Sequence, residues 1–331
     1  MHLPPERRVM PASGCFALFD GDAGSALLLT SCCRSFQLNT LVDPVSVFVA
    51  VEAALAAGQW VALAADYALG ASFERAIAAV PPGRPVLRAW AFAHAERLDA
   101  EAVQAFLAGR LAAIPEEQRA AGIAELFASV GPGRHAAQVR QVCRWIADGD
   151  CYQVNLTFPL TFRIYGHPLA LYARLRARQP VRYGGYVEIG EEAILSFSPE
   201  LFFERHGSRV RTRPMKGTAP RGNTPREDEG MLAALLSSAK ERAENIMIVD
   251  LLRNDLGRLA QPGKVHVEAL CEAEAYPTLW QMVSTVAAEL PGTGLAELFG
   301  ALFPCGSITG APKIRAMQRI AELEDSPRGL Y

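Results

Sequence analysis

The chain has 331 residues, of which 50% are hydrophobic, so it can bury one large core or two closely packed ones. Its net charge of −2, from 33 basic and 35 acidic residues, gives no electrostatic basis for binding nucleic acid or an anionic membrane. No signal-peptide core, no run of 18 apolar residues and no C-x-x-C pair among the seven cysteines occurs, so a protein of the reducing cytoplasm is expected.

The first half of the chain contains both strand and helix patterns. Two apolar runs around a Gly-Asp-Ala-Gly turn predict a hairpin over residues 15–30. Asp43 as a cap and Pro44 at the first helical position predict a helix over 43–57. Further patterns predict a buried strand at 59–65 and helices at 99–114 and 134–149.

The second half begins with short apolar segments separated by glycine-containing turns, a pattern typical of antiparallel strands. These predicted strands are residues 152–164, 183–189, 192–197, 200–205 and 208–213. Three prolines and two glycines in 213–227 predict an irregular loop, and a long helix is expected over 228–257. Shorter elements are expected within 265–290 and a helix over 312–324. This mixture indicates an α+β fold, with a candidate domain boundary in 115–133.

Two segments among these strands suggest polar chemistry. Gln153, Asn155 and Thr157 share one face of a strand, so they can line a polar cavity or simply face solvent. Glu200 is followed closely by two phenylalanines. In an apolar pocket its pKa would rise and it could act as a general acid; the alternative is an exposed glutamate at a strand start.

The segment around Lys216 combines cations with glycines. The glycines let backbone N–H groups approach an anion, and Arg213, Lys216 and Arg221 add positive charge. A free lysine amine, with a pKa of ~10.4, is almost entirely protonated at pH 7, so a nucleophilic role needs a setting that favours the neutral amine. A solvated basic loop is the alternative.

Glu241 and Glu244 lie at i and i+3 of the predicted helix, so their carboxylates project from one face. Two such carboxylates suit a hard, oxygen-seeking cation such as Mg²⁺. The alternative is an exposed helix face on which Lys240 and Arg242 are the ion partners.

The segment 304–313 resembles a nucleotide-binding loop but lacks its pattern, because Ala311 and Pro312 separate Gly310 from Lys313. It can still bind an anion at a helix start. Its glycines allow close approach of a ligand, and Ser307 and Thr309 offer hydroxyl groups.

Together and in this order, these segments resemble the chorismate-utilising enzymes, a family that includes anthranilate, aminodeoxychorismate, isochorismate and salicylate synthases. The matching pieces are GDCYQVNLT, SFSPELFF, RPMKGTAPRG, KERAENIMIVDLLRNDLGR, PTLWQMVSTVAAEL and PCGSITGAPKIRAMQRIAELE. The resemblance implies the fold of anthranilate synthase component I, with two large antiparallel sheets stacked in a sandwich and helices outside. It also implies an N-terminal α/β part over 1–120 and a chorismate-binding catalytic region over 121–331.

Lysine at position 216 distinguishes members of this family, because anthranilate synthases have alanine there and aminodeoxychorismate synthases have lysine. The resemblance therefore implies replacement of the 4-hydroxyl of chorismate by an amino group, on the route to 4-aminobenzoate and folate. Lys216 would attack the ring at C2 and Glu200 would be the general acid. Gln153 stands where water-using members carry a lysine base, which agrees with ammonia as the nucleophile.

The resemblance also implies a metal, substrate contacts and a partner. Glu244 and Glu241 would hold Mg²⁺, and a separate glutamine amidotransferase would supply the ammonia. Gln281 stands where many members have histidine. The expected substrate-binding residues are Gly217, Thr218, Ser307, Thr309, Gly310 and Tyr331.

The family pattern continues beyond the R-G-x-Y motif at which this sequence ends, and the continuation carries further acidic Mg²⁺ ligands. We therefore expect a catalytic region that is incomplete at its C-terminus, and a chain that is weakly active or inactive. Two alternatives stay open: another chorismate enzyme, such as anthranilate or isochorismate synthase, or a fragment that only binds the amidotransferase or chorismate.

Overall fold

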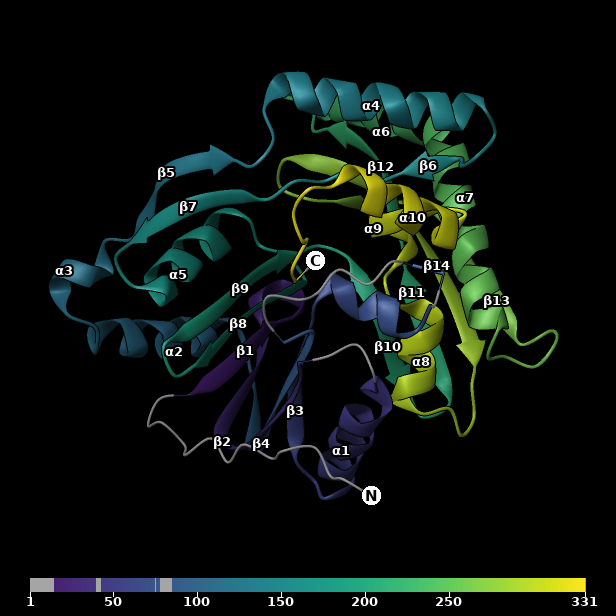
Figure 1. Cartoon of the computed structure of the whole chain (residues 1–331). Helices are drawn as coiled ribbons and strands as arrows, with labels where there is room; N and C mark the ends of the chain where they lie inside the picture. Colours follow the sequence, from purple (N-terminus) through teal and green to yellow (C-terminus); the bar gives the residue numbers. More distant parts are fainter. Residues whose placement is uncertain (1–14, 40–42, 75, 78–84, 331) are drawn as a thin grey trace.

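The computed structural model describes residues 15–39, 43–74, 76–77 and 85–330. The architecture is α+β with two large antiparallel sheets, as the sequence predicts (Figure 1). The first sheet has the order β3 (Trp60–Ala65), β4 (Leu87–Leu98), β2 (Ala26–Leu38), β1 (Phe16–Asp20), β8 (Tyr183–Ile189) and β9 (Glu192–Ser198). The second has the order β10 (Leu201–His206), β11 (Arg209–Arg213), β14 (Leu279–Glu289) and β12 (Met215–Pro220), with β13 (Val265–Ala275) also on β14.

The first sheet combines strands that lie far apart in the sequence. The predicted hairpin is confirmed, because Phe16 of β1 pairs with Thr30 of β2. On its other side Phe16 pairs with Glu188 of β8, so the sheet takes strands from both sides of residue 120. The division into parts 1–120 and 121–331 stays a prediction. If it holds, both parts contribute strands to this one sheet.

The second sheet corrects the loop predicted over 213–227. Residues Met215–Pro220 form β12, which is paired with β14 more than sixty residues later in the chain. The register shifts between Met215 and Thr218, so Lys216 and Gly217 form a β-bulge. The prolines and glycines correctly indicated irregular backbone, but the sequence around them does not show that the segment pairs with a distant strand.

The long helix predicted over 228–257 is two helices. α6 (Pro225–Ser237) ends before Ser238, whose extended backbone separates it from α7 (Ala239–Gly257). The Ser238 side chain then accepts a hydrogen bond from the backbone N–H of Glu241, which caps the second helix.

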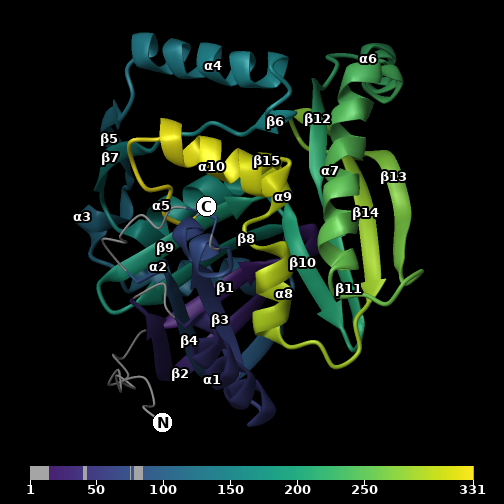
Figure 2. The same ribbon diagram turned by 45° about the vertical axis from the view of Figure 1, so that its right-hand side comes forward.

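An aromatic cluster joins the two sheets. Phe48 of α1 (Pro44–Ala56) contacts Phe299 of α8 (Leu295–Leu302), with ring centroids 4.7 Å apart. Phe202 and Phe203 of β10 pack edge-on against Phe299. Figure 2 shows α8 between the two sheets, and its other side packs on α7.

The remaining elements surround these sheets. Strand β4 was not predicted, and the strand predicted over 152–164 is two separate strands. Within the described residues no helix has the length and apolarity needed to cross a membrane. These remaining elements are η1 (Asp22–Gly24), η2 (Tyr67–Ser72), α2 (Ala100–Ala112), α3 (Glu116–Arg119), β5 (Gly122–Ala128), α4 (Pro132–Ala147), β6 (Gln153–Val154), β7 (Leu160–Tyr165), α5 (Pro168–Arg178), α9 (Gly306–Thr309), β15 (Gly310–Ala311) and α10 (Lys313–Leu323).

Candidate active site

The structure brings together three of the residues singled out in the sequence. The Nζ atom of Lys216, on β12, donates a hydrogen bond to the backbone carbonyl of Ser307 on α9, at 3.0 Å. Glu200 lies just before β10, and its Oε1 atom accepts a hydrogen bond from the N–H of Met215 at 3.3 Å. Lys216 is therefore flanked by the segment that carries Glu200 and by the segment that carries Ser307.

The carboxyl group of Glu200 is buried, although the residue keeps some exposed surface. Burial raises the pKa of Glu200 above its ordinary value. The Ser307 side chain, the charge of Lys216 and the N–H of Met215 oppose that rise. Burial is the largest of these effects, so this environment favours a protonated carboxyl group that can donate a proton.

Cys305 is a neighbour that the sequence did not single out. The pKa of its thiol is raised to about 11, chiefly by burial and in smaller part by the nearby Glu200. A neutral thiol beside Glu200 adds no charge to the site. Its place in the P-C-G-S-I-T-G segment was the one available signal.

Gly310 and Gln153 meet through their backbones. β15 pairs with β6, placing Gly310 opposite Val154 and Ala311 opposite Gln153. A Cβ on Gly310 would lie 2.1 Å from the Gln153 carbonyl oxygen, so this approach requires glycine. The Oε1 atom of the Gln153 side chain is buried and has no hydrogen-bond partner among the described residues.

The α9 segment uses its two hydroxyl-bearing residues differently. Thr309 is buried and its hydroxyl hydrogen-bonds to the carbonyls of Cys305 and Gly306, at 3.1 and 3.2 Å, within α9 itself. Ser307 is also buried, but it faces Glu200 and Lys216. Tyr331 lies outside the described residues.

Glu241 and Glu244 lie on the face of α7 near β12. Their carboxylates are 3.5 and 3.7 Å from the ammonium group of Lys240, which is largely exposed. Lys240 is thus close enough to be the ion partner that the sequence left open. The Oε2 atom of Glu241 would lie 3.3 Å from a Cβ on Gly217, so this carboxylate adjoins the Lys216 bulge. Among the described residues, no cluster of three or more His, Cys, Asp or Glu side chains could hold a metal alone.

Arg328, which the sequence also left unassigned, connects the segments around α9. Its guanidinium donates to the carbonyls of Ile308 and Asn155, both at 2.6 Å, and forms an ion pair with Glu324. It lies over the Tyr67 ring at 4.5 Å from the centroid. These contacts fix the positions of β6 and α9 relative to each other.

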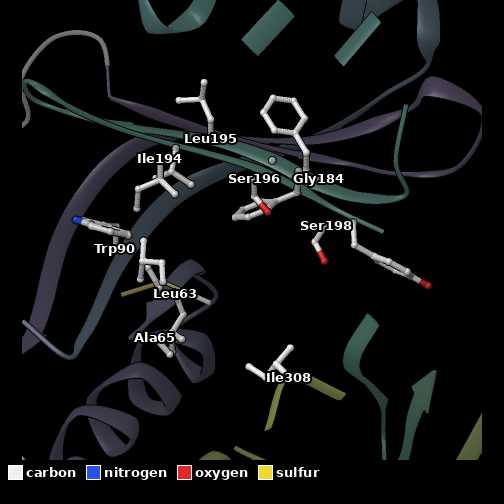
Figure 3. Close-up of a pocket in the computed structure, with 16 residues that line it drawn as sticks. Leu63, Ala65, Trp90, Gly184, Ile194, Leu195, Ser196, Ser198 and Ile308 are labelled. Carbon is white, nitrogen blue, oxygen red and sulfur yellow. The ribbon is translucent and has the colours of Figure 1, made fainter. Parts of the chain in front are cut away.

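A cavity of about 620 Å³ lies beside α9, between the first sheet and Ile308 (Figure 3). Leu63, Trp90 and Ile194 give it mostly apolar walls, and Ser196 supplies a hydroxyl group. Glu200 and Lys216 are not among its lining residues. The cavity nevertheless borders the segments that carry Glu200 and Ser307, because it is lined by Ile308, next to Ser307, and by Ser198, whose hydroxyl donates to the carbonyl of Glu200.

Comparison with known sequences places this geometry in context. The profile of the chorismate binding enzyme family matches residues 33–331. Aminodeoxychorismate synthase component 1 of Salmonella typhimurium is 43% identical over 198 residues, which cover 60% of this chain and 44% of that protein. Anthranilate synthase component 1 of Thermus thermophilus is 41% identical over 226 residues, which cover 68% of this chain and 49% of that protein. The matched part is thus less than half the length of either relative.

Comparison of structures gives the same fold. Anthranilate synthase component I from Streptococcus pneumoniae superposes with a TM-score of 0.77 and 22% sequence identity, covering 94% of this chain and 79% of that one. The fold class expected from the sequence is therefore confirmed.

Proposed function

This chain belongs to the chorismate binding enzyme family, and we propose that it is the chorismate-binding subunit of an aminodeoxychorismate synthase. The observation that carries the proposal is the setting of Lys216. Its amine projects from a β-bulge towards α9, close to the buried carboxyl group of Glu200. A lysine beside a proton donor is the pair that covalent substitution of a ring hydroxyl requires.

In the first half of the proposed reaction, the neutral amine of Lys216 attacks C2 of the chorismate ring. The N–C2 bond forms, the two conjugated double bonds of the ring each move by one position (from C1=C2 and C5=C6 to C1=C6 and C4=C5), and the C4–O bond breaks. The protonated carboxyl group of Glu200 transfers its proton to the departing hydroxyl, which leaves as water. The raised pKa of Glu200 supports this role, because it keeps the proton available.

In the second half, ammonia attacks C4 and both double bonds return to their first positions as the C2–N bond to Lys216 breaks. The proton that ammonia loses returns to the carboxylate of Glu200. The sum is chorismate plus ammonia giving aminodeoxychorismate plus water. Gln153 supports ammonia over water as the nucleophile, because an amide side chain cannot act as the base that would activate water.

Glu241 and Glu244 are the proposed holders of Mg²⁺. Mg²⁺ commonly binds one or two protein carboxylates and takes its other oxygens from water and substrate, so the pair on α7 fits this ion. When bound, it would supply positive charge to a carboxylate of the substrate. Lys240 is largely exposed, so water can take its place beside both carboxylates.

The proposed substrate contacts lie around Lys216 and Glu200. Gly217 and Thr218 follow Lys216, and Ser307 adjoins Glu200. The Thr309 hydroxyl is already hydrogen-bonded to carbonyls at α9, and Gly310 packs closely against the backbone of Gln153. Thr309 and Gly310 would therefore act by shaping the backbone of the substrate site. Tyr331 completes the proposed set.

The proposal includes a partner and a place in metabolism. The relatives are named component 1 of their synthase, which supports a second component. We propose that this component is a glutamine amidotransferase that supplies ammonia, and that both work in the cytoplasm in the synthesis of 4-aminobenzoate and folate. Residues 121–331 would be the catalytic region, with 1–120 as the N-terminal part.

The test is to incubate the chain, both as given and extended to the length of its curated relatives, with chorismate, Mg²⁺ and ammonium and to identify the product by mass spectrometry. Aminodeoxychorismate is the expected product of the extended chain, and a Lys264→Ala variant of it, which changes an exposed lysine away from the site, should form the product equally well. Anthranilate or isochorismate would replace the proposed activity with that of another family member. Chorismate binding without turnover, measured by calorimetry, would leave this chain a binding subunit only.

A further inference from the structure

The β-bulge at Lys216 leaves two backbone carbonyls outside the regular ladder. Met215 pairs with Val283 and Thr218 pairs with Gln281, so β12 has one more residue than β14 between these two pairs. The backbone of Lys216 and Gly217 is displaced from its partner strand as a result. Gly217 has φ +94°, a conformation that L side chains rarely adopt. Buried carbonyls in such a bulge need donors from elsewhere.

Asn245 supplies one of these donors from α7. It is fully buried, and its Nδ2 atom donates to the carbonyl of Lys216 at 3.2 Å and to that of Met282 at 3.4 Å. The direction of its amide is fixed by Ser284, whose hydroxyl donates to Oδ1 of Asn245. Ser284 in turn accepts a hydrogen bond from the N–H of Cys271 at 2.9 Å, so its own hydrogen is directed to Asn245.

Gln281 supplies the second donor from β14. Its Nε2 atom donates to the carbonyl of Gly217 at 2.9 Å, and its Oε1 atom accepts from the hydroxyl of Thr218, also at 2.9 Å. Both ends of this amide are thus engaged on the segment that follows Lys216. Two amides from different elements therefore hold two consecutive carbonyls.

We infer that Asn245 and Gln281 are positioning residues that fix the direction in which Lys216 leaves the bulge. With its own carbonyl and that of Gly217 held, the Lys216 backbone has one orientation, and the amine is delivered to the carbonyl of Ser307. Neither amide touches the amine itself. This inference rests on the proposed function only in the statement that the held amine is the nucleophile.

A purely structural role for these amides is the competing explanation, and Gln138 provides a matched control. Gln138 is also buried, and its Nε2 atom donates to the carbonyl of Leu323 at 2.6 Å, in α10 and away from Lys216. Gln138→Met should lower the stability of the fold, because it also removes an amide donor from a backbone carbonyl. It should leave the environment of Lys216 unchanged.

The experiment measures how fast acetic anhydride modifies Lys216, relative to the exposed Lys264, by peptide mass spectrometry. Gln281→Met and Asn245→Asp should increase this ratio roughly two- to tenfold, the effect of losing one net hydrogen bond, because the amine is no longer held in its half-buried place. Gln281→Glu removes the donor to Gly217 but keeps the acceptor for Thr218, so it should match Gln281→Met. Equal ratios in the wild type, these variants and Gln138→Met would overturn the inference.

Kinetics separate the inference from the proposed function. In an active wild type, the Gln281 variants should lose roughly 10²-fold in kcat with KM within about twofold, because misplacing a reacting group slows chemistry more than binding. If the wild type extended to the length of its relatives shows no turnover while the variants show altered acetylation ratios, the proposed function is refuted and the inference is kept. An active wild type matched by all variants in kcat refutes the inference alone.

Discussion

Lys216 and Ser307 are hydrogen-bonded from side chain to backbone across 91 positions of the sequence, with 3.0 Å between Nζ and the carbonyl oxygen. This contact ties the bulged strand β12 to the short helix α9. Because α9 runs directly into β15, which pairs with β6, the amine and the backbone of Gln153 belong to one connected group. A change in any of these segments should therefore alter the position of the Lys216 amine.

Replacement of Lys216 by alanine tests the covalent route. Lys216→Ala should lower formation of aminodeoxychorismate by roughly 10³-fold or more, as expected when a nucleophile is removed. It should also abolish any adduct of protein and chorismate that intact-protein mass spectrometry detects in the absence of ammonium. Lys264→Ala serves as the control, and unchanged product formation by Lys216→Ala would remove the lysine from the mechanism.

The stability of the protein should depend on pH through Glu200. Its pKa is raised in the folded state, so between the ordinary and the raised value the folded chain keeps a proton that the unfolded chain has lost. The free energy of unfolding must then fall as pH rises through that window. Glu200→Gln removes this slope, so the variant should gain stability relative to wild type as pH rises. Urea midpoints from pH 4 to pH 8 measure it, and parallel curves for the two proteins would contradict it.

Activity should depend on the same proton in the same direction. A general acid must be protonated, so kcat should decrease as pH rises through the raised pKa of Glu200. Glu200→Asp should keep a descending limb at a shifted position, whereas Glu200→Gln should lose both the limb and most of the rate. A descending limb that persists in Glu200→Gln would assign it to another group.

A buried ion pair next to the site should be costly to break. The ammonium group of Lys313 lies 2.6 Å from the Asp255 carboxylate, with both side chains nearly inaccessible, and it also donates to the last carbonyls of α8. Lys313→Met should destabilise the fold by about 3–5 kcal/mol, because the carboxylate stays buried without its partner. The double variant Lys313→Met with Asp255→Leu should recover a large part of this loss in urea unfolding. Equal losses in the single and double variants would show that the charge left behind is not the cause.

The carboxylates on α7 should determine the response to Mg²⁺. Glu244→Gln and Glu241→Gln should each weaken the apparent affinity for Mg²⁺ in the presence of chorismate, by roughly 10-fold or more. Calorimetric titration measures this without turnover. Glu229→Gln, on α6, is the control for a change of charge alone, and an unchanged affinity in both α7 variants would place the ion elsewhere.

The chemistry-bearing segments were readable from the sequence because each has a local signature. The two aromatic residues after Glu200 left burial and exposure open, and the structure buries its carboxyl group; the glycines around Lys216 indicated an unusual backbone. The break at Ser238 was also readable, since Ser238 followed by Glu241 is a helix-capping spacing, but the apolar pattern of 228–257 hid it. Local signals thus singled out residues whose roles stay predictions, whereas several predicted element boundaries were wrong.

What the sequence could not give is the set of partners for backbone carbonyls. Asn245 and Arg328 act on carbonyls of segments far from them in the chain, and a carbonyl is present at every residue. No residue pattern marks which carbonyl is left outside a ladder. Strand β12 was missed for the same reason, because its identity depends on pairing with β14.

The pairing of Phe16 with Glu188 sets an order of events during synthesis. When the strand that carries Phe16 leaves the ribosome, its neighbour β8 does not yet exist, and at ~5–20 residues per second it follows on the order of 10 s later. During that time the nascent chain exposes one unpaired edge of β1. Pairing of β1 with β8 is then expected to be a slow step of folding, because it joins segments far apart in the sequence. The first sheet of this protein is therefore completed by residues translated long after its first strand.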